Sequence, residues 1–182
     1  CGQQIKKEYQ LTPEEYEEAL LRIYDLASEG KIYIRPICAP HYFRILAQKG
    51  SYHSGGHPGG HPGSIKRGEF DNLTKGCLAG TGICFISHKG EVFPCGYLPL
   101  SCGNVRFKRL KDIWDHSDLF YVLRRPLELM GKCGICAFKA ICSGCRARAH
   151  EAEGNFLAEE PNCLYEPRKG IKTPISLKDQ NE

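Results

Sequence analysis

Cys133-Gly-Ile-Cys136, then Cys142-Ser-Gly-Cys145 and, after seventeen intervening residues, Cys163 form the densest group of thiols in the chain. Soft thiolate ligands select zinc, copper(I) and iron–sulfur clusters over hard cations. Two C-x2-C pairs this close together are also more typical of metal ligation than of a disulfide framework. The group therefore predicts a metal centre and leaves the identity of the metal open.

A second group of thiols precedes the first. Its members are Cys77, Cys84 and Cys95. Residues 83–87 and 91–94 are expected to form two short strands around a turn at Gly90, where glycine supplies a positive φ. This hairpin folds the chain back and brings the three thiols near one another. This group of three thiols is one ligand short of a four-thiolate site, and the first group of five has one too many. Together they make eight thiols, which suggests two four-thiolate sites.

The composition fits a small domain with an unusual number of cysteines. The chain has 182 residues, 41% of them hydrophobic, and eleven cysteines. A secreted disulfide protein is one explanation, but no apolar signal segment precedes the first expected helix. No run approaches the roughly 18 apolar residues of a membrane span. We therefore expect a soluble, cytoplasmic protein in a reducing compartment, with no membrane partner.

The formal net charge of +4 is too small to indicate a nucleic-acid partner. Several basic side chains lie near the cysteines in sequence and could offset negatively charged clusters, receive substrate carboxylates, or simply be solvated. They are Arg106, Lys108, Arg109, Lys111, Arg124, Arg125, Arg146 and Arg148. Arg146 and Arg148 flank Cys145, so they are either donors to a metal centre or ordinary surface charges of a helix.

The first expected element is a helix that starts after Thr12. Thr12 is a plausible N-cap, Pro13 suits the first helical position, and Glu15 completes a capping box. An apolar stripe at helical spacing follows and lies opposite an acidic face. The stripe consists of Tyr16, Leu20, Ile23, Tyr24 and Ala27, and the acidic face of Glu14, Glu17 and Glu18. Gly30 should end this helix.

Residues 31–37 alternate and are rich in isoleucine, which predicts a strand that presents Cys38, His41 and Arg44 at its end. Helix then strand is the repeating unit of an α/β barrel, in which strand ends carry the chemistry. The three residues are therefore candidates for substrate contact, and Arg44 suits a carboxylate. Against this, an isolated cysteine is often a small buried hydrophobe, and Arg44 equally suits a surface ion pair.

Residues 49–68 contain two Gly-Gly-His-Pro repeats and almost nothing apolar. They are expected to form a flexible connector. The alternative is a flap whose imidazoles, from His53, His57 and His61, contact a metal or a tetrapyrrole iron.

Two helices are expected further along, at about 110–125 and 142–154. Pro126 should stop the first of them. Its Trp114 and Phe120 are expected to pack in the core. The polar tail should be poorly ordered.

The cysteine pattern resembles the SPASM extension of radical S-adenosylmethionine enzymes: C-x9-15-G-x4-C, then C-x2-C-x5-C-x3-C, then a final C. The match runs from Cys77 to Cys163, with two residues instead of three between the last pair. The resemblance implies two auxiliary [4Fe-4S] clusters. One would be held by Cys77, Cys84, Cys95 and Cys145, and the other by Cys133, Cys136, Cys142 and Cys163. Each such cluster would carry about −2 with its four thiolates, which would bring the chain near neutrality.

One branch of that family is especially similar. The segments that carry the likeness are Gly82-Ile-Cys84-Phe-Ile-Ser-His-Lys-Gly-Glu-Val-Phe-Pro-Cys95-Gly-Tyr-Leu-Pro, Gly103-Asn-Val, Cys145-Arg-Ala-Arg-Ala, Glu159-Glu-Pro-Asn-Cys163 and Cys38-Ala-Pro-His41-Tyr-Phe-Arg44. They resemble the radical enzymes of alternative haem biosynthesis, which trim or oxidatively decarboxylate side chains of sirohaem-derived iron tetrapyrroles. Relatives in that branch serve the haem of denitrifying nitrite reductases.

The C-x3-C-x2-C motif of the S-adenosylmethionine cluster does not occur among these residues. The resemblance therefore implies the C-terminal part of a larger α+β enzyme, with S-adenosylmethionine and a third [4Fe-4S] cluster bound upstream. Residues 1–48 would be the last helix and strand of a radical barrel, 49–68 a loop, 69–168 the SPASM domain and 169–182 a tail.

In the full oxidoreductase or decarboxylase, the auxiliary clusters would accept an electron after hydrogen abstraction or position the substrate. The chain alone would be inactive. The implied partners are the upstream barrel, a carboxylated iron tetrapyrrole and a redox protein. Two alternatives stay open: a structural zinc module that uses the same thiols, and a small two-cluster electron carrier.

Overall fold

The structure is a computed structural model that describes residues 9–31, 34, 36–51 and 75–167. The predicted loop histidines and the tail at 169–182 lie outside the described residues. The elements follow the order α1 (Pro13–Ser28), α2 (His41–Gln48), β1 (Phe85–Ile86), β2 (Glu91–Phe93), β3 (Gly103–Asn104), α3 (Leu110–His116), α4 (Asp118–Leu123), η3 (Pro126–Glu128), α5 (Gly131–Ile135) and α6 (Arg146–Glu153). This is the α+β class that the sequence predicts.

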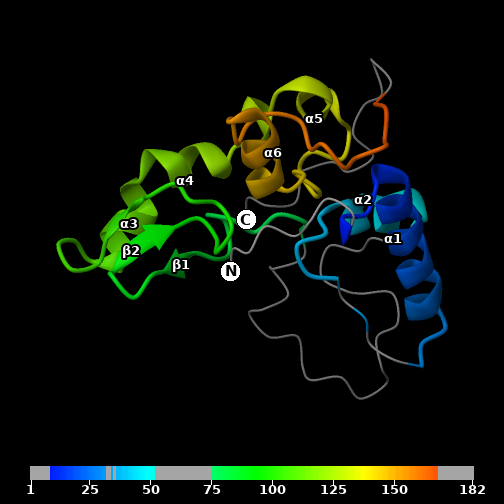
Figure 1. Cartoon of the computed structure of the whole chain (residues 1–182), viewed down its shortest axis with the longest axis horizontal. Helices are drawn as coiled ribbons and strands as arrows, with labels where there is room; N and C mark the ends of the chain where they lie inside the picture. The colour runs from blue at the N-terminus through cyan, green and yellow to red at the C-terminus, as the bar shows by residue number, and fades with distance from the viewer. Residues whose placement is uncertain (1–8, 32–33, 35, 52–74, 168–182) are drawn as a thin grey trace, which may run out of the picture.

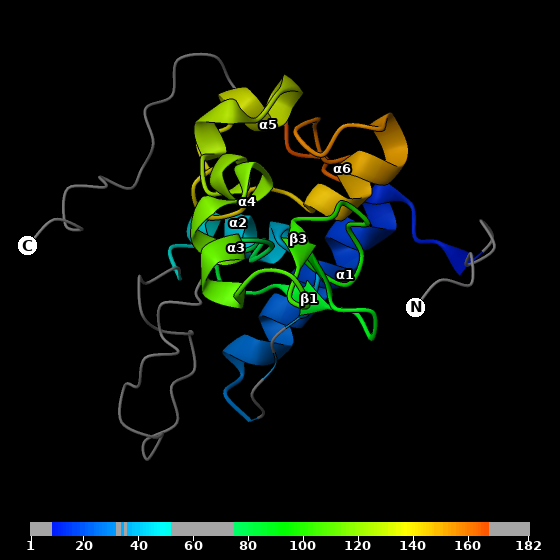
Figure 2. The same ribbon diagram turned by 90° about the vertical axis from the view of Figure 1, so that its left-hand side faces the viewer.

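Three groups of elements make up the molecule (Figure 1). Helices α1 and α2 pack together at one end, while the sheet lies at the other end with α3 and α4. Helices α5 and α6 lie between these ends. The beginning of α1 is beside α6 (Figure 2), where Arg148 Nη2 is 3.3 Å from the Tyr16 hydroxyl. No helix among the described residues is long and apolar enough to span a membrane.

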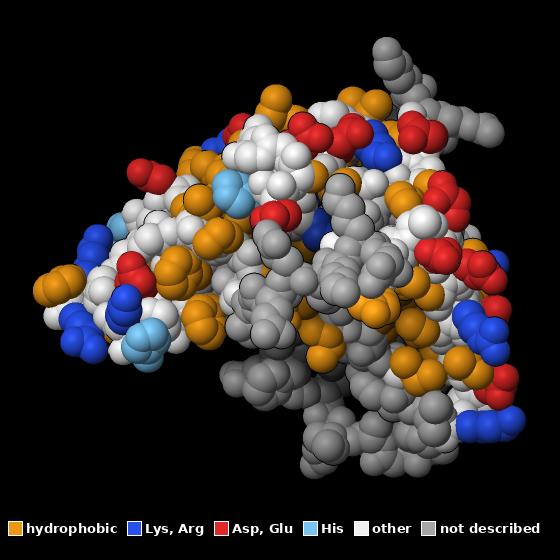
Figure 3. All heavy atoms as spheres, viewed as in Figure 1, with side chains coloured by type: hydrophobic (Ala, Val, Ile, Leu, Met, Phe, Trp, Pro, Cys, Tyr) orange, Lys and Arg blue, Asp and Glu red, His pale blue; other side chains and the backbone are white. Residues whose placement is uncertain are grey.

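Helix α1 begins and ends where the sequence predicts. Its capping box is complete, with Glu15 N donating to Thr12 Oγ1 at 3.2 Å and Thr12 N donating to Glu15 Oε2 at 2.8 Å. Gly30, at φ 69°, follows the C-cap and donates to the Ala27 carbonyl at 3.2 Å. The acidic face of the helix lies along one edge of the molecule (Figure 3), opposite the stripe that packs on α2.

Helix α2 corrects the prediction that a strand presents His41 and Arg44 at its end. Residues 32, 33 and 35 fall outside the described part, and the described positions 34, 36 and 37 are not in a strand. Tyr42, Ile45 and Leu46 follow helical spacing and bury one face against Leu20 of α1. In the described residues the sheet is three-stranded and antiparallel, so no barrel strand is seen there.

The predicted hairpin is present as β1 and β2, with Phe85 opposite Phe93 and Ile86 opposite Val92. Its turn requires Gly90, which has φ 84° and whose added Cβ would lie 2.8 Å from Asn104 Oδ1. Strand β3 was not predicted and pairs with the other side of β2.

The predicted helix at 110–125 is instead two helices. Ser117 is extended, with φ −75° and ψ 126°, and separates α3 from α4. The bend lets Ile113 and Phe120 both pack on Val92 of the sheet. Trp114 contacts Phe120 with ring centroids 5.0 Å apart, which confirms that both rings belong to the core. Pro126 ends this region and starts η3.

Helix α6 starts at Arg146, later than predicted, because residues 143 and 144 are in the left-handed region, each at φ 59°. It ends at Gly154, as expected. Helix α5 was not predicted. Between α5 and α6, Phe138, Ile141 and Cys142 form a small hydrophobic cluster with Ala47 and Tyr165 packed against it.

Candidate metal centre

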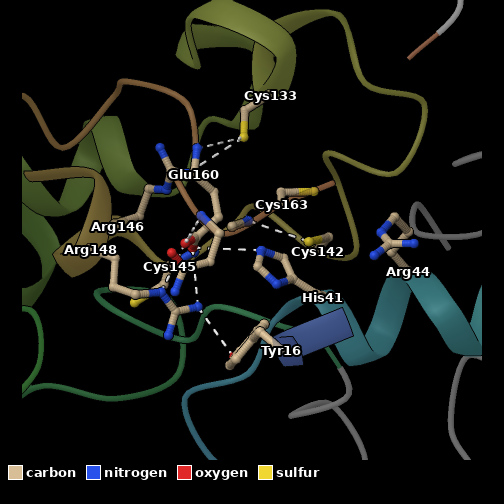
Figure 4. Close-up of polar contacts among 12 residues, drawn as sticks. Tyr16, His41, Arg44, Cys133, Cys142, Cys145, Arg146, Arg148, Glu160 and Cys163 are labelled. Atoms are coloured by element: carbon tan, nitrogen blue, oxygen red, sulfur yellow. Dashed lines mark hydrogen bonds and ion pairs between the residues drawn. The ribbon is translucent and has the colours of Figure 1, made fainter. Parts of the chain in front are cut away.

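Four of the predicted ligands line one open pocket: Cys133, Cys136, Cys142 and Cys163. Helix α5 supplies Cys133, and Cys136 is its C-cap. Cys142 comes from the turn before α6, and Cys163 from the C-terminal segment that returns across it (Figure 4). The sequence neighbour Cys145 does not line this pocket. The pocket thus brings together the four thiols of one implied group and leaves Cys145 outside.

Backbone amides point at three of these sulfurs. Phe138 N is 3.4 Å from Cys136 Sγ, Gly144 N is 3.4 Å from Cys142 Sγ, and Glu160 N is 3.4 Å from Cys133 Sγ. Amide donors favour the charged thiolate, which is the form that binds metal. The loops around the pocket are therefore shaped to stabilise negative charge on sulfur.

Burial acts on the thiols in the opposite direction. Desolvation raises the pKa of Cys136 and of Cys163, and it raises the pKa of the buried Cys142 most. The amide donors lower these pKa values only in part. Metal binding must therefore displace protons from this site.

The second group, which we call the hairpin-side group, is Cys77, Cys84, Cys95 and Cys145. Cys77 N donates to the Cys142 carbonyl at 3.1 Å, which joins the hairpin region to the turn before α6. Burial raises the pKa of Cys145, and the negative charge of Cys77 raises it further. Burial likewise raises the pKa of Cys95, and the negative charge of Cys145 raises it further. The charge of Cys145 thus acts on the pKa of Cys95 and also on the pKa of the exposed Cys38.

Cys84 lies elsewhere. It packs beside Cys102 against the cluster of Val92, Ile113 and Phe120. Burial raises the pKa of Cys102 to about 11, with a smaller contribution from Cys84. In the described part of the chain the electrostatic interactions link three of the four predicted hairpin-side ligands, and Cys84 is the one left out.

Glu160 is the central polar residue of the region, and the sequence did not single it out. Its side chain is fully buried, and the residue lies between Cys133 and Cys145 (Figure 4). Oε2 accepts from Cys145 N at 2.5 Å, Oε1 accepts from Arg148 Nε at 2.8 Å, and the Glu160 amide faces Cys133 Sγ. Its position three residues before Cys163 is the signal that could have drawn attention to it.

The three candidate substrate residues lie in different surroundings. His41 is fully buried, lines the pocket, and has Nε2 3.7 Å from Glu160 Oε2. Burial lowers the pKa of His41 to about 4, although the nearby Glu160 carboxylate acts to raise it. The ring is therefore neutral at pH 7. Arg44 also lines the pocket and is paired with Glu17. Cys38 is exposed, has φ 57°, and accepts from Arg148 Nη1 through its carbonyl at 3.1 Å.

The ten described cysteines are all free, so none of them supports a disulfide framework. Among the described residues, no group of three or more His, Cys, Asp or Glu side chains is arranged to hold one metal ion. A four-thiolate zinc site needs all four sulfurs about 2.3 Å from a single point.

Residues 77–146 match the SPASM family, an iron–sulfur cluster-binding domain. The resemblance that the cysteine pattern suggested is thereby confirmed, and the chain carries a domain of the class that binds iron–sulfur clusters.

Similar proteins extend this likeness beyond the domain. The chain is 47% identical, over 88% of its length, to the AdoMet-dependent heme synthase of Methanosarcina barkeri, and 46% identical, over 87%, to that of Oleidesulfovibrio alaskensis. It is 36% identical, over 55%, to the pre-heme d1 synthase of Dinoroseobacter shibae. These matches cover 44%, 39% and 26% of the respective relatives, so the chain spans less than half of their length. No solved structure matches the chain significantly.

Proposed function

We propose that this chain is the auxiliary-cluster part of a radical S-adenosylmethionine enzyme that acts on side chains of a sirohaem-derived iron tetrapyrrole. The two proposed [4Fe-4S] sites are the hairpin-side group and the group of Cys133, Cys136, Cys142 and Cys163. The observation that carries the proposal is the convergence of this second group on one pocket. The names of the similar proteins support haem synthesis as the setting.

The pocket suits a four-iron cluster. Such a cluster needs four thiolates, and donors near its sulfurs tune its potential. Four cysteines and three amide donors supply these features. Arg44, Lys132 and Lys139 also line the pocket and would offset the net negative charge of the cluster.

The proposed role of the clusters is electron acceptance. A bound [4Fe-4S] cluster supplies a one-electron acceptor, and a cluster with all four irons bound to cysteine has no open iron for substrate. The four thiols that line one pocket therefore favour electron transfer over direct substrate binding at that site. The residues of this chain would hold the clusters, keep Cys142 buried and place donors beside the sulfurs.

The proposal also concerns the tetrapyrrole side. His41 and Arg44 lie in the cysteine pocket with their side chains buried, which favours a role beside the cluster. Cys38 is exposed and remains the best placed of the three for substrate contact. The upstream barrel, S-adenosylmethionine with its own cluster, and the redox partner are further parts of this proposal.

Metal analysis after anaerobic reconstitution tests the proposal. The chain should bind about eight irons and eight sulfides and show broad absorption near roughly 400 nm, as two four-thiolate clusters require. Two tightly bound zinc ions and a colourless protein would contradict it and favour a structural zinc module. Binding of a carboxylated iron porphyrin, followed by its spectral shift, separates the enzyme from a simple electron carrier.

A further inference from the structure

His41 is a buried polar side chain whose ring nitrogens are unpaired. It is the first residue of α2, and its side chain is completely buried. Neither Nδ1 nor Nε2 has a hydrogen-bond partner among the described residues. Buried polar groups in folded proteins are almost always hydrogen-bonded, because leaving one unpaired loses the free energy of its hydration. The ring therefore indicates a partner other than the described side chains and backbone.

The side chain of His41 extends from α2 toward the cysteine pocket (Figure 4), which is lined by Cys133, Cys136, Cys142 and Cys163. Arg44, three residues later in α2, lines the same pocket and is only 3% exposed. Its terminal nitrogens donate to Gln48 and Glu17. Its Nε is buried and has no partner in the part of the chain that the structure describes. Helix α2 thus contributes two buried side chains with unpaired nitrogens to the wall of the cysteine pocket.

The protein neighbours of His41 position the ring without pairing its nitrogens. Glu160 Oε2 is 3.7 Å from Nε2, which is too long for a hydrogen bond. That oxygen already accepts from Cys145 N at 2.5 Å and from Arg148 Nη2 at 3.3 Å. The Tyr16 ring packs edge-on against the imidazole, with centroids 5.3 Å apart. The ring is therefore held in place by packing, and its hydrogen-bonding capacity is left for the pocket.

Sulfur atoms are the acceptors that fit this pocket. Four cysteines are enough for the four irons of a [4Fe-4S] cluster, so an imidazole beside them would meet thiolate and sulfide sulfurs and no open iron. Such sulfurs accept hydrogen bonds from nearby donors. An imidazole carries at least one N–H in either protonation state. The chemistry of the pocket thus favours a histidine donor over a histidine ligand.

We propose that His41 donates a hydrogen bond from its ring to a sulfur of the cluster held by Cys133, Cys136, Cys142 and Cys163. This inference rests on the proposed function. The cluster site then extends beyond the matched domain at residues 77–146 to α2, which lies before that domain in the chain. A donor to a cluster sulfur favours the reduced cluster, because reduction adds negative charge.

Pulsed electron paramagnetic resonance of the full 182-residue chain, reconstituted anaerobically and then reduced, tests the hydrogen bond. Labelling histidine alone with nitrogen-15 distinguishes its ring from the backbone amides near the sulfurs. We expect a weak coupling between histidine nitrogen and the cluster spin, and its loss in His41→Gln. His116→Gln is the matched control and should keep the coupling, because His116 is exposed on α3 and does not line the pocket.

Three results would overturn the inference. They are the absence of histidine coupling in the iron-loaded chain, a coupling that persists in iron-loaded His41→Gln, and a coupling strong enough for a nitrogen bound directly to iron. If His41→Gln binds no iron, a labelled chain that keeps only His41 of its seven histidines decides, and loss of the coupling there overturns the inference. If the unsubstituted chain binds no iron, the proposed function itself fails.

Discussion

Glu160 contacts both cysteine groups, one through its carboxylate and the other through its backbone amide. Its side chain holds the amide of Cys145 and the guanidinium of Arg148, while its own amide faces Cys133 Sγ. A buried charge is tolerated when it is paired and hydrogen-bonded. The position of Glu160 therefore depends on α6 and fixes α6 relative to the segment that carries Cys163.

Glu160→Gln tests this arrangement. The substitution keeps the shape of the side chain but leaves Arg148 without its counter-ion. Breaking a buried ion pair costs about 3 to 5 kcal/mol. The Arg148 side chain is 28% exposed, so solvent screening reduces the expected loss in free energy of unfolding to about 2 kcal/mol. Denaturant unfolding of the reduced chain measures it.

Glu151→Gln is the matched control, because Glu151 is exposed on the same helix. It should change the free energy of unfolding by less than about 0.5 kcal/mol. Equal effects of the two substitutions would contradict the role given to Glu160.

At the scale of elements, the turn before α6 decides where Cys142 and Cys145 point. Ser143 and Gly144 both lie at φ 59°, which delays the start of α6 until Arg146. The turn places Cys142 in the pocket and makes Cys145 the N-cap of the helix. Two neighbouring thiols can thus serve different sites.

Gly144→Ala should disturb this turn. The added Cβ would meet Arg146 Nη2 at 2.5 Å and Glu160 Cβ at 2.9 Å, and an L-residue at positive φ adds strain. We expect a loss of about 3 kcal/mol in the free energy of unfolding and reduced iron binding.

Gly154→Ala isolates the backbone contribution. Gly154 has φ 66° and open space around its Cα, so the loss should be about 1 kcal/mol with iron content unchanged. If Gly144→Ala costs no more than Gly154→Ala, crowding at the turn is not important.

Local signals in the sequence were enough for some elements. The capping box of Thr12 and Glu15, the hairpin turn at Gly90 and the helix end at Gly154 depend on neighbouring residues, and all three are present. Elements that depend on distant contacts were missed. Helix α2 is buried against α1, and the bend at Ser117 fits two helices to one small sheet.

The same distinction holds for the site. The resemblance of the cysteine pattern to the SPASM extension implied the four cysteines that line the pocket. It could not predict that Glu160 is buried, because that requires Arg148 and the amide of Cys145 from another segment. Nor could spacing show that Cys84 lies beside Cys102 rather than interacting with Cys145.

At the scale of the whole molecule, the described residues form three small hydrophobic clusters rather than one large core. The part around α5 and α6 contains short helices joined by loops, and desolvation raises the pKa of Cys142. Metal binding contributes folding free energy where the ligands come from separate segments. We therefore infer that the clusters stabilise the middle of the molecule.

Limited proteolysis under anaerobic conditions should show this dependence. Removal of iron with a chelator should make the 131–167 region cleavable at least tenfold faster, since a tenfold change needs only about 1.4 kcal/mol of local stability. Cleavage after α1 should change little, because α1 packs on α2 through apolar side chains. Uniform protection with and without iron would contradict the prediction.

The most direct test of the account counts iron in two cysteine variants of the anaerobically reconstituted chain. Cys163 lines the pocket, whereas Cys102 belongs to neither group of ligands. Cys102→Ala should keep about eight irons, and Cys163→Ala should fall to about four, because one of the two four-iron sites loses a ligand. Equal iron contents in the two variants, or zinc in place of iron in both, would contradict the assignment of Cys163 to a four-thiolate cluster.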